Sequence, residues 1–160
     1  INAFIEILKN YSNLNLVILG DGEEKWKLKN LIKKNNLEKK IFLVGYKENI
    51  YSYLKNSKMF ILTSRWEDPG FVLIEAAYMN KTVLSSDCPN GPKEILDNEK
   101  NGFLFESNSM ASFIKKFDEI QNSEKRVLLK KKISFKKKIK EFTLVNHFNV
   151  FSNLLTDHEN

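Results

Sequence analysis

The sequence has few of the residues that cross-link a chain or bind metals. Among its 160 residues there is one cysteine, Cys88, and there are two histidines, His147 and His158. A single cysteine excludes an internal disulfide, and so few thiol and imidazole groups predict no cluster of metal ligands. This usage favours a reducing, cytosolic setting.

Long apolar runs are also missing. No stretch approaches the roughly 20 apolar residues of a membrane-spanning helix, and the start, I-N-A-F-I-E-I-L-K, lacks the charged-then-apolar layout of a signal peptide. The sequence therefore predicts a soluble chain. Because it opens directly in a helical pattern, with neither an initiator Met nor a leader, we expect it to be a piece of a longer protein.

What the sequence does contain is the composition of one globular domain. Hydrophobic residues make up 42% and charged residues 29%, and twelve phenylalanines supply bulky material for a core. The net charge of +6 is uneven, because nine of the 26 basic residues lie between positions 125 and 140, where there is no acid. The other 17 basic residues are outnumbered by 20 acids, so the rest of the chain is slightly acidic.

Short strands alternate with helices along the first two thirds of the chain. Apolar runs predict five buried strands, at residues 15–20, 41–45, 59–63, 82–86 and 102–105. Apolar residues at helical spacing predict the helices, at residues 2–11, 23–35, 50–55, 71–79 and 92–96. Strands that are apolar on both faces and alternate with helices favour a parallel sheet covered on both sides. The predicted fold class is α/β, a Rossmann-like doubly wound parallel sheet.

Helical patterns continue from Met110 to the end, with one segment to about Ile120, a basic one from about Ser123, and an apolar one near 142–155. We predict a Rossmann-like domain at 1–122 and C-terminal helices at 123–160. Two interpretations of the basic segment 125–140 stay open. It is either a solvated amphipathic helix whose apolar residues face the core, namely Leu128, Phe135 and Ile139, or an attachment to anionic lipid. We expect no nucleic-acid binding, since no aromatic and basic platform accompanies the charge.

Glycines follow the first predicted strand. In an open parallel sheet, ligands bind beyond the carboxyl ends of the strands. Gly20-Asp21-Gly22 stands there, and its missing side chains would let a phosphate or sugar approach backbone N–H groups. The same motif also serves as a plain strand-to-helix turn, and the sequence leaves both interpretations open.

The segment after the third predicted strand, T-S-R-W-E-D-P-G-F-V-L-I-E-A-A, is more specific, with Glu67 and Glu75 separated by seven residues. A helix starting near Gly70 would place Glu75 roughly 7.5 Å along its axis. The first N–H groups, those of Gly70, Phe71 and Val72, would then favour a diphosphate, and the carboxylates would accept hydrogen bonds from sugar hydroxyls. The alternative is that Glu67 and Asp68 only favour the helix N-terminus electrostatically, while Glu75 is one more solvated helical residue.

This segment resembles the two-glutamate signature of retaining glycosyltransferases of GT-B architecture, the "glycosyl transferases group 1" type, and is similar to those that build bacterial polysaccharides and capsules. Two later segments resemble the family in the same order, S-S-D-C-P-N-G-P-K-E-I-L at 85–96 and E-K-N-G-F-L-F at 99–105. The resemblance covers about residues 15–120. It implies one half of a GT-B fold, the C-terminal domain that binds the nucleotide-sugar donor.

The resemblance also assigns roles by position. Glu67, the expected catalytic residue, would contact donor-sugar hydroxyls, the amides of 70–72 the sugar and diphosphate, and Glu75 the ribose. Gly91, before a proline at a helix start, lets the backbone approach the donor or serves as an ordinary helix cap. Tyr46 either stacks on the nucleobase or packs beside its strand, and packing is the commoner outcome. Gly20 and Gly22 complete the expected donor site.

The resemblance implies that a hexose or N-acetylhexosamine is transferred, with retention, from a UDP-sugar to a glycan or lipid-linked acceptor. No Asp-x-Asp occurs in the sequence, which fits the family's metal-independent chemistry, so we expect no metal and no cofactor besides the UDP-sugar substrate. The family's basic diphosphate-binding residues and its acceptor-binding N-terminal domain would precede Ile1. We therefore expect this chain to transfer little by itself, and its last helix to dock on that missing domain.

Two other functions remain open at this point. One is a sugar-nucleotide epimerase of the same architecture, and the other is a non-catalytic module for nucleotide-sugar binding or membrane attachment. For the leading hypothesis we expect a cytoplasmic enzyme. With residues 125–140 bound to lipid, it would be peripheral on the inner face of the membrane.

Overall fold

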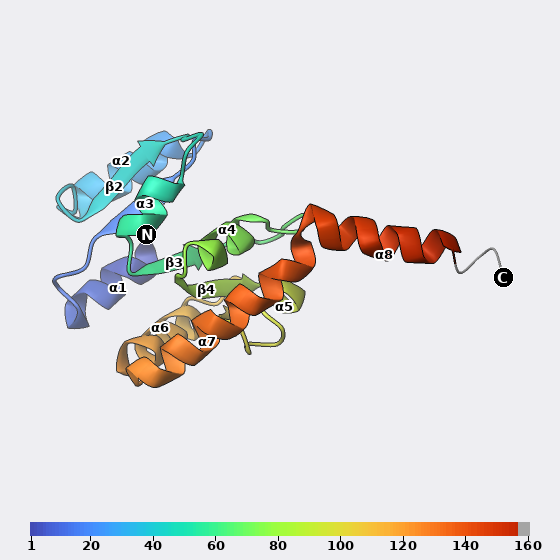
Figure 1. Cartoon of the computed structure of the whole chain (residues 1–160). Helices are drawn as coiled ribbons and strands as arrows, with labels where there is room; N and C mark the ends of the chain where they lie inside the picture. Colours follow the sequence, from blue (N-terminus) through green and yellow to red (C-terminus); the bar gives the residue numbers. More distant parts are fainter. Residues whose placement is uncertain (157–160) are drawn as a thin grey trace. The chain divides into compact units, whose positions relative to one another are not determined.

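A computed structural model describes residues 1–156, apart from the side chains of Leu154 and Thr156 (Figure 1). His158, one of the two histidines, lies outside the described residues. The chain forms two compact units, Ile1–Tyr53 and a second unit that begins at Leu54. Each unit is described by itself below.

The first unit is a pair of parallel strands joined by a helical crossover. It contains α1 (Asn2–Asn10), β1 (Leu16–Leu19), α2 (Lys25–Lys34) and β2 (Ile41–Gly45), and α3 (Tyr51–Asn56) leads into the second unit. β1 pairs with β2 from Leu16 opposite Ile41, and the register shifts after Ile18, so that Leu19 lies opposite Gly45. The carboxyl ends of the two strands therefore lie side by side.

The second unit has a three-stranded parallel sheet in the order β3 (Met59–Leu62), β4 (Thr82–Asp87) and β5 (Phe103–Glu106). Its helices are α4 (Val72–Tyr78), α5 (Pro92–Ile95), α6 (Met110–Asn122), α7 (Lys125–Lys138) and α8 (Leu144–Thr156), with the 3₁₀ turn η1 (Ile139–Phe142) between the last two. Val83 and Leu84, neighbours on β4, are 1% and 0% exposed. Because consecutive strand residues point to opposite faces, both faces of this central strand are covered.

The observed elements confirm the predicted α/β class of parallel strands and covering helices. Each predicted strand and helix is present with its ends moved by at most a few residues. Among the described residues the five strands form two parallel ladders, one that pairs β1 with β2 and one in which β4 pairs with both β3 and β5. Apolar patterns identify strands but do not specify their neighbours. The domain boundary after residue 122 stays a prediction.

The basic helix α7 is anchored by one of its own lysines. Phe135 is fully buried, and Leu128 and Ile139 are partly buried, which confirms the core-facing apolar residues of the amphipathic interpretation. The Lys131 ammonium lies 4.6 Å from the centre of the Phe103 ring. It donates hydrogen bonds to the carbonyl oxygens of Gly102, at 3.0 Å, and of Glu99. Burial lowers the pKa of Lys131.

Replacing Lys131 by Met should therefore destabilise the protein by about 1–3 kcal/mol, because two partly buried carbonyl groups lose their donor while the apolar stem is kept. Lys130→Met, at the exposed neighbouring position, is the matched control and should change stability by at most about 0.5 kcal/mol. Urea unfolding measures both. Equal unfolding free energies for the two variants would show that the Lys131 contacts contribute nothing.

The last helix presents apolar residues to the surface. Leu144, Phe148, Phe151 and Leu155 recur at helical spacing, and each is more than half exposed. Docking on a further domain stays a prediction.

Candidate functional site

The candidate site is built from the loops that follow β3 and β4. The loop after β3 runs from Thr63 to Phe71, and α4 begins at Val72. The predicted helix start near Gly70 is two residues too early. Gly70 has a φ of +88°, which lies outside the helical region, so its N–H group belongs to the loop. Only the N–H groups of Phe71 and Val72 stand at the start of the helix.

Two hydrogen bonds join the loops. At the end of β4 the Ser86 hydroxyl donates to the Ser64 carbonyl oxygen over 2.6 Å, and Ser86 is 1% exposed. Further along, the Glu67 N–H donates to the Pro89 carbonyl oxygen over 3.3 Å. The loop that carries Glu67 is therefore held at two points by the segment that follows β4.

Gly91 allows the closest approach between these loops. A Cβ atom at Gly91 would lie 1.8 Å from the carbonyl oxygen of Pro69, and Gly91 has a φ of +117°. We predicted from the sequence that this glycine admits a ligand or caps a helix. Gly91 is the N-cap residue of α5, which confirms the helix-cap interpretation, and the group against it is the Pro69 carbonyl, so Gly91 also lets the two loops meet.

The two glutamates lie on the same loop-to-helix segment. Glu75 is the fourth residue of α4, and its N–H donates to the Phe71 carbonyl oxygen over 3.1 Å. Glu67 and Glu75 are both partly buried, and no ion pair among the described residues includes either. Two partly buried carboxylates without a protein cation are available to accept hydrogen bonds from a polar ligand. The interpretation of Glu75 as a solvated helical residue is therefore weakened.

The remaining predicted residues lie in the first unit, where Gly20 and Tyr46 follow adjacent strands. The Gly20 N–H donates to the Gly45 carbonyl oxygen over 2.9 Å, and the Gly22 N–H to the Asp21 carboxylate over 3.0 Å. Because both amides already have acceptors, the geometry favours the plain turn for Gly20 and Gly22. Their role in donor binding stays a prediction.

Asp21 serves that turn. Its carboxylate accepts a 2.6 Å hydrogen bond from the Lys25 ammonium, and Lys25, followed by the Gly22 N–H, lowers the pKa of Asp21. Tyr46 is 72% exposed, so the commoner interpretation, packing beside the strand, is wrong. The exposed ring leaves stacking on a ligand as the open alternative.

Polar side chains surround a depression of about 620 Å³ beside the carboxyl end of β4. Its lining residues are Asp87, Cys88, Pro89, Asn90, Gly91, Lys93, Glu94 and Asn98. Of the predicted site residues in the second unit, the lining includes Gly91 but not Glu67 or Glu75. Cys88, one of the lining residues, is buried.

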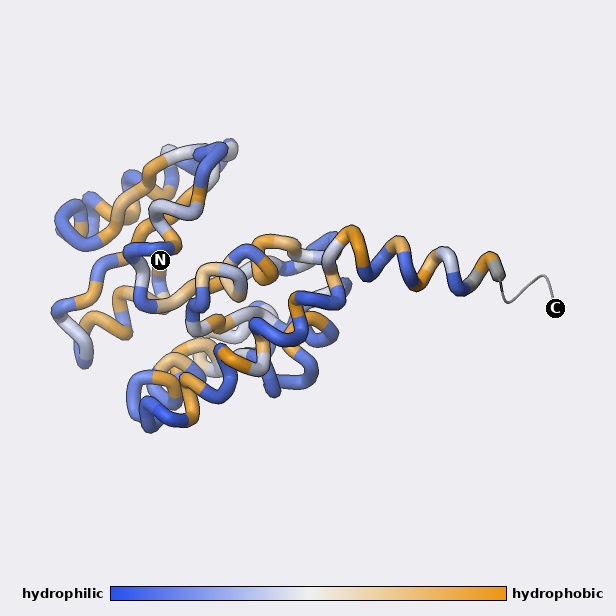
Figure 2. Tube along the Cα trace, viewed as in Figure 1, coloured by the Kyte–Doolittle hydropathy of each residue, from blue (hydrophilic) through white to orange (hydrophobic). Residues whose placement is uncertain are grey.

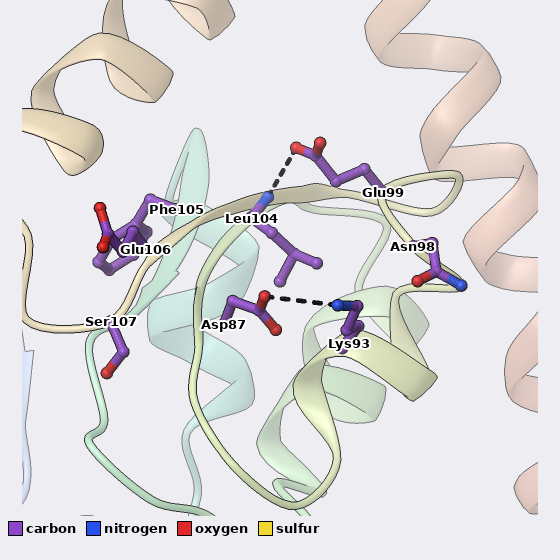
Figure 3. Close-up of a pocket in the computed structure, with 8 residues that line it drawn as sticks. All are labelled: Asp87, Lys93, Asn98, Glu99, Leu104, Phe105, Glu106 and Ser107. Carbon is purple, nitrogen blue, oxygen red and sulfur yellow. Dashed lines mark hydrogen bonds and ion pairs between the residues drawn. The ribbon is translucent and has the colours of Figure 1, made fainter.

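A neighbouring depression of about 430 Å³ extends to the end of β5 (Figure 3). Asp87 and Lys93 face each other across it, 3.8 Å apart. On its rim Glu99 accepts a hydrogen bond of 2.9 Å from the Leu104 N–H. Burial alone would raise the pKa of Glu99, but this bond and the Lys116 ammonium outweigh it and lower the pKa.

Sequence reasoning missed three of these residues. Lys93 directly follows Gly91-Pro92, so a cation beside an expected diphosphate site could have been noticed. Ser86 and the carbonyl of Pro69 gave no signal, because their roles come from loops that meet only in the fold. The described residues contain no group of three or more His, Cys, Asp or Glu side chains placed to hold a metal ion. None of their helices combines the length and apolarity needed to cross a membrane.

Comparison with known proteins identifies the family to which this chain is similar. The sequence profile of the family described as "Glycosyl transferases group 1" matches residues 1–142. A curated relative from Escherichia coli, named UDP-Gal:alpha-D-GlcNAc-diphosphoundecaprenol alpha-1,3-galactosyltransferase, is 35% identical over 139 residues, 84% of this chain and 33% of the relative. An uncharacterised glycosyltransferase of Methanocaldococcus jannaschii is 44% identical over 101 residues, 63% of this chain and 25% of the relative.

A solved structure agrees with the sequence matches. Staphylococcus aureus TarM, crystallised with UDP and alpha-GlcNAc-glycerol among its ligands, has a TM-score of 0.82 at 25% identity. The match covers 96% of this chain and 32% of TarM. The chain thus spans a quarter to a third of the length of these relatives. The resemblance to GT-B glycosyltransferases that the motifs suggested is confirmed.

Proposed function

Because the chain belongs to the glycosyl transferases group 1 family, we propose that it binds the sugar-nucleotide donor of a glycosyl transfer, a UDP-sugar, through the loops after β3 and β4. One observation carries the proposal. The loop with Glu67 is fixed against the loop with Gly91 by the Glu67–Pro89 hydrogen bond and the Gly91–Pro69 approach. Glu67 thus stands in the loop at the carboxyl end of β3, and Glu75 follows it on α4, in the region where open α/β sheets bind ligands.

In this proposal each part of the donor meets a different group. Glu67 accepts hydrogen bonds from sugar hydroxyls, and Glu75 accepts them from the ribose, because ionised carboxylates are acceptors only and form strong bonds to hydroxyls. The N–H groups of the segment 70–72 face the diphosphate. Preorganised donors of this kind stabilise the charge that grows on the leaving diphosphate while the sugar acquires oxocarbenium character. Neither carboxylate acts as a base, and no metal or cofactor takes part.

The relatives' names support a proposal for the transferred sugar and its acceptor. The Escherichia coli relative is named for galactose transfer to a diphosphoundecaprenol-linked sugar, and the TarM crystal contained UDP with a GlcNAc glycoside. A hexose or N-acetylhexosamine moving with retention to a glycan or lipid-linked acceptor is the corresponding proposal for this chain. With a lipid-linked acceptor, the corresponding proposal is a cytoplasmic enzyme that is peripheral on the inner face of the membrane.

Transfer needs a second, acceptor-binding domain in this proposal. The chain matches only a quarter to a third of the relatives' lengths, and the exposed apolar residues of α8 offer a surface for a further domain. Alone, the chain should bind donor weakly and transfer little sugar.

Saturation-transfer NMR with UDP at millimolar concentration tests the donor site, since this method detects weak binding. We expect saturation to be transferred from the protein to the uracil and ribose protons of UDP, and we expect UDP-sugars to compete with UDP. CMP, with a different base and a single phosphate, is the matched control and should compete poorly. The proposal would be contradicted if no saturation reached the UDP protons, or if CMP competed as well as UDP-sugars do.

A further inference from the structure

The helix α7 has a second face that the fold does not use. Leu128, Lys131 and Phe135 are directed to the protein, whereas Leu129 and Ile133 are 50% and 49% exposed. These two apolar residues are four positions apart and therefore lie one above the other on the same side of the helix. In Figure 2 apolar segments recur between the hydrophilic ones along α7.

Exposed cations flank this pair. Arg126, Lys130, Lys136 and Lys137 are all exposed, and each lies three or four positions from Leu129 or Ile133, or from another of these cations. None of the four takes part in an ion pair among the described residues. The nine basic residues of 125–140 are thus of different kinds, since Lys131 is held by carbonyl groups and Lys138 pairs with Glu141.

We propose that this surface, the basic-apolar face of Arg126, Leu129, Lys130, Ile133, Lys136 and Lys137, binds the surface of an anionic lipid bilayer. The cations meet the headgroup phosphates, and the two aliphatic side chains enter the boundary between headgroups and acyl chains. On a helix that only faces solvent, Leu129 and Ile133 would keep apolar surface in water at the centre of the charged face. Contact with a bilayer would bury that surface.

The apolar pair also decides between lipid and nucleic acid as the partner. A lipid surface offers both negative charge and an apolar layer directly beneath it. The phosphate backbone of a nucleic acid offers charge without an apolar counterpart for two aliphatic side chains. The charge and the apolar content of the face together match the lipid.

The size of the effect follows from the number of cations. Each basic residue near an anionic leaflet contributes about fivefold in partitioning. Removing four should therefore lower binding by up to several hundredfold if all four contributions add, and by at least roughly tenfold if only two of the four contact the leaflet. The attraction should weaken as salt screens it. Donor binding does not enter this argument, so failure of one proposal leaves the other standing.

Co-sedimentation with vesicles tests the face on the whole chain. We expect binding to phosphatidylcholine vesicles that contain phosphatidylglycerol, weakened by salt, and little binding to phosphatidylcholine alone. Arg126→Gln/Lys130→Gln/Lys136→Gln/Lys137→Gln should lose at least roughly tenfold. Leu129→Ser/Ile133→Ser should lose several-fold without changing the salt dependence. Circular dichroism checks that each variant remains folded.

A matched control removes the same charge elsewhere. Lys29→Gln/Lys33→Gln/Lys34→Gln/Lys39→Gln changes exposed residues of the first unit and should leave vesicle binding within about twofold of the wild type. Equal losses for this control and for the α7 variant would reduce the effect to net charge and overturn the proposal. So would loss of binding in Phe148→Ser/Phe151→Ser on α8 with the α7 variants unaffected. Duplex DNA binding as tight as vesicle binding, and insensitive to Leu129→Ser/Ile133→Ser, would assign the face to nucleic acid instead.

Discussion

Replacing Gly91 by Ala should disrupt the candidate site more than any other single methyl group added to it. The new Cβ would lie 1.8 Å from the Pro69 carbonyl oxygen, so one of the two loops has to move. Forced contacts of this kind cost about 1–3 kcal/mol, and a non-glycine residue at this φ of +117° costs roughly another 1–3 kcal/mol. Losses of this size are a large part of the roughly 5–15 kcal/mol that stabilises a typical domain.

Gly20→Ala separates the two costs. Gly20 has almost the same φ, +118°, but a Cβ there meets nothing within 4 Å. The Ala variant at Gly20 should therefore show the backbone strain alone, and the excess at Gly91 is the clash with Pro69. Urea unfolding followed by circular dichroism measures both variants, and in a Trp26→Phe background the fluorescence of Trp66, which lies on the displaced loop, reports unfolding of the Gly91 variant near the site. Equal destabilisation at the two glycines would mean that the loops separate freely and that their contact is unimportant.

The two glutamates should fail in different ways when donor binding is measured. Glu75→Gln is expected to weaken UDP and UDP-sugar binding alike, because the ribose is common to both ligands. Glu67→Gln should weaken only the UDP-sugar, because UDP lacks the hydroxyls that Glu67 is proposed to hold. Loss of a charged hydrogen-bond partner is worth roughly 1.5–3 kcal/mol, or about tenfold to a hundredfold in affinity.

Titration by ligand-observed NMR measures both affinities for each variant. Glu124→Gln, at an exposed position before α7, removes the same charge and should change neither affinity. A loss of UDP affinity in Glu67→Gln as large as that in Glu75→Gln would contradict the separate roles. Unchanged affinities in both variants would remove the glutamates from the donor site altogether.

Local patterns predicted the elements of this fold well, because each helix or strand expresses its own periodicity. The strand at 41–45 and the helix start at Pro92 agree with the structure to the residue. The start of α4 was misplaced, since the positive φ of Gly70 depends on how its loop packs. No local pattern indicates that β1 and β3 belong to different ladders, because pairing is a relation between distant segments.

The candidate site was predictable where a motif defines it and not where two loops create it. Glu67 and Glu75 came from their spacing and from the family resemblance. That the carbonyl of Pro69 lies against Gly91, or that Ser86 holds Ser64, follows only from the meeting of the β3 and β4 segments. The exposure of Tyr46 could not be predicted from the sequence either, because it depends on whether distant segments pack against the end of β2.

The contacts between these two loops have a thermodynamic consequence for ligand recognition. Because Ser86, Pro89 and Gly91 hold the Glu67 loop through contacts within the protein, little conformational entropy remains to be lost when a donor binds. Discrimination between donors should then arise in the enthalpy of individual side-chain contacts, with a small heat-capacity change, and not in the ordering of a segment. Sugar selectivity would accordingly be altered by exchanging single side chains while the loop backbone stays as it is.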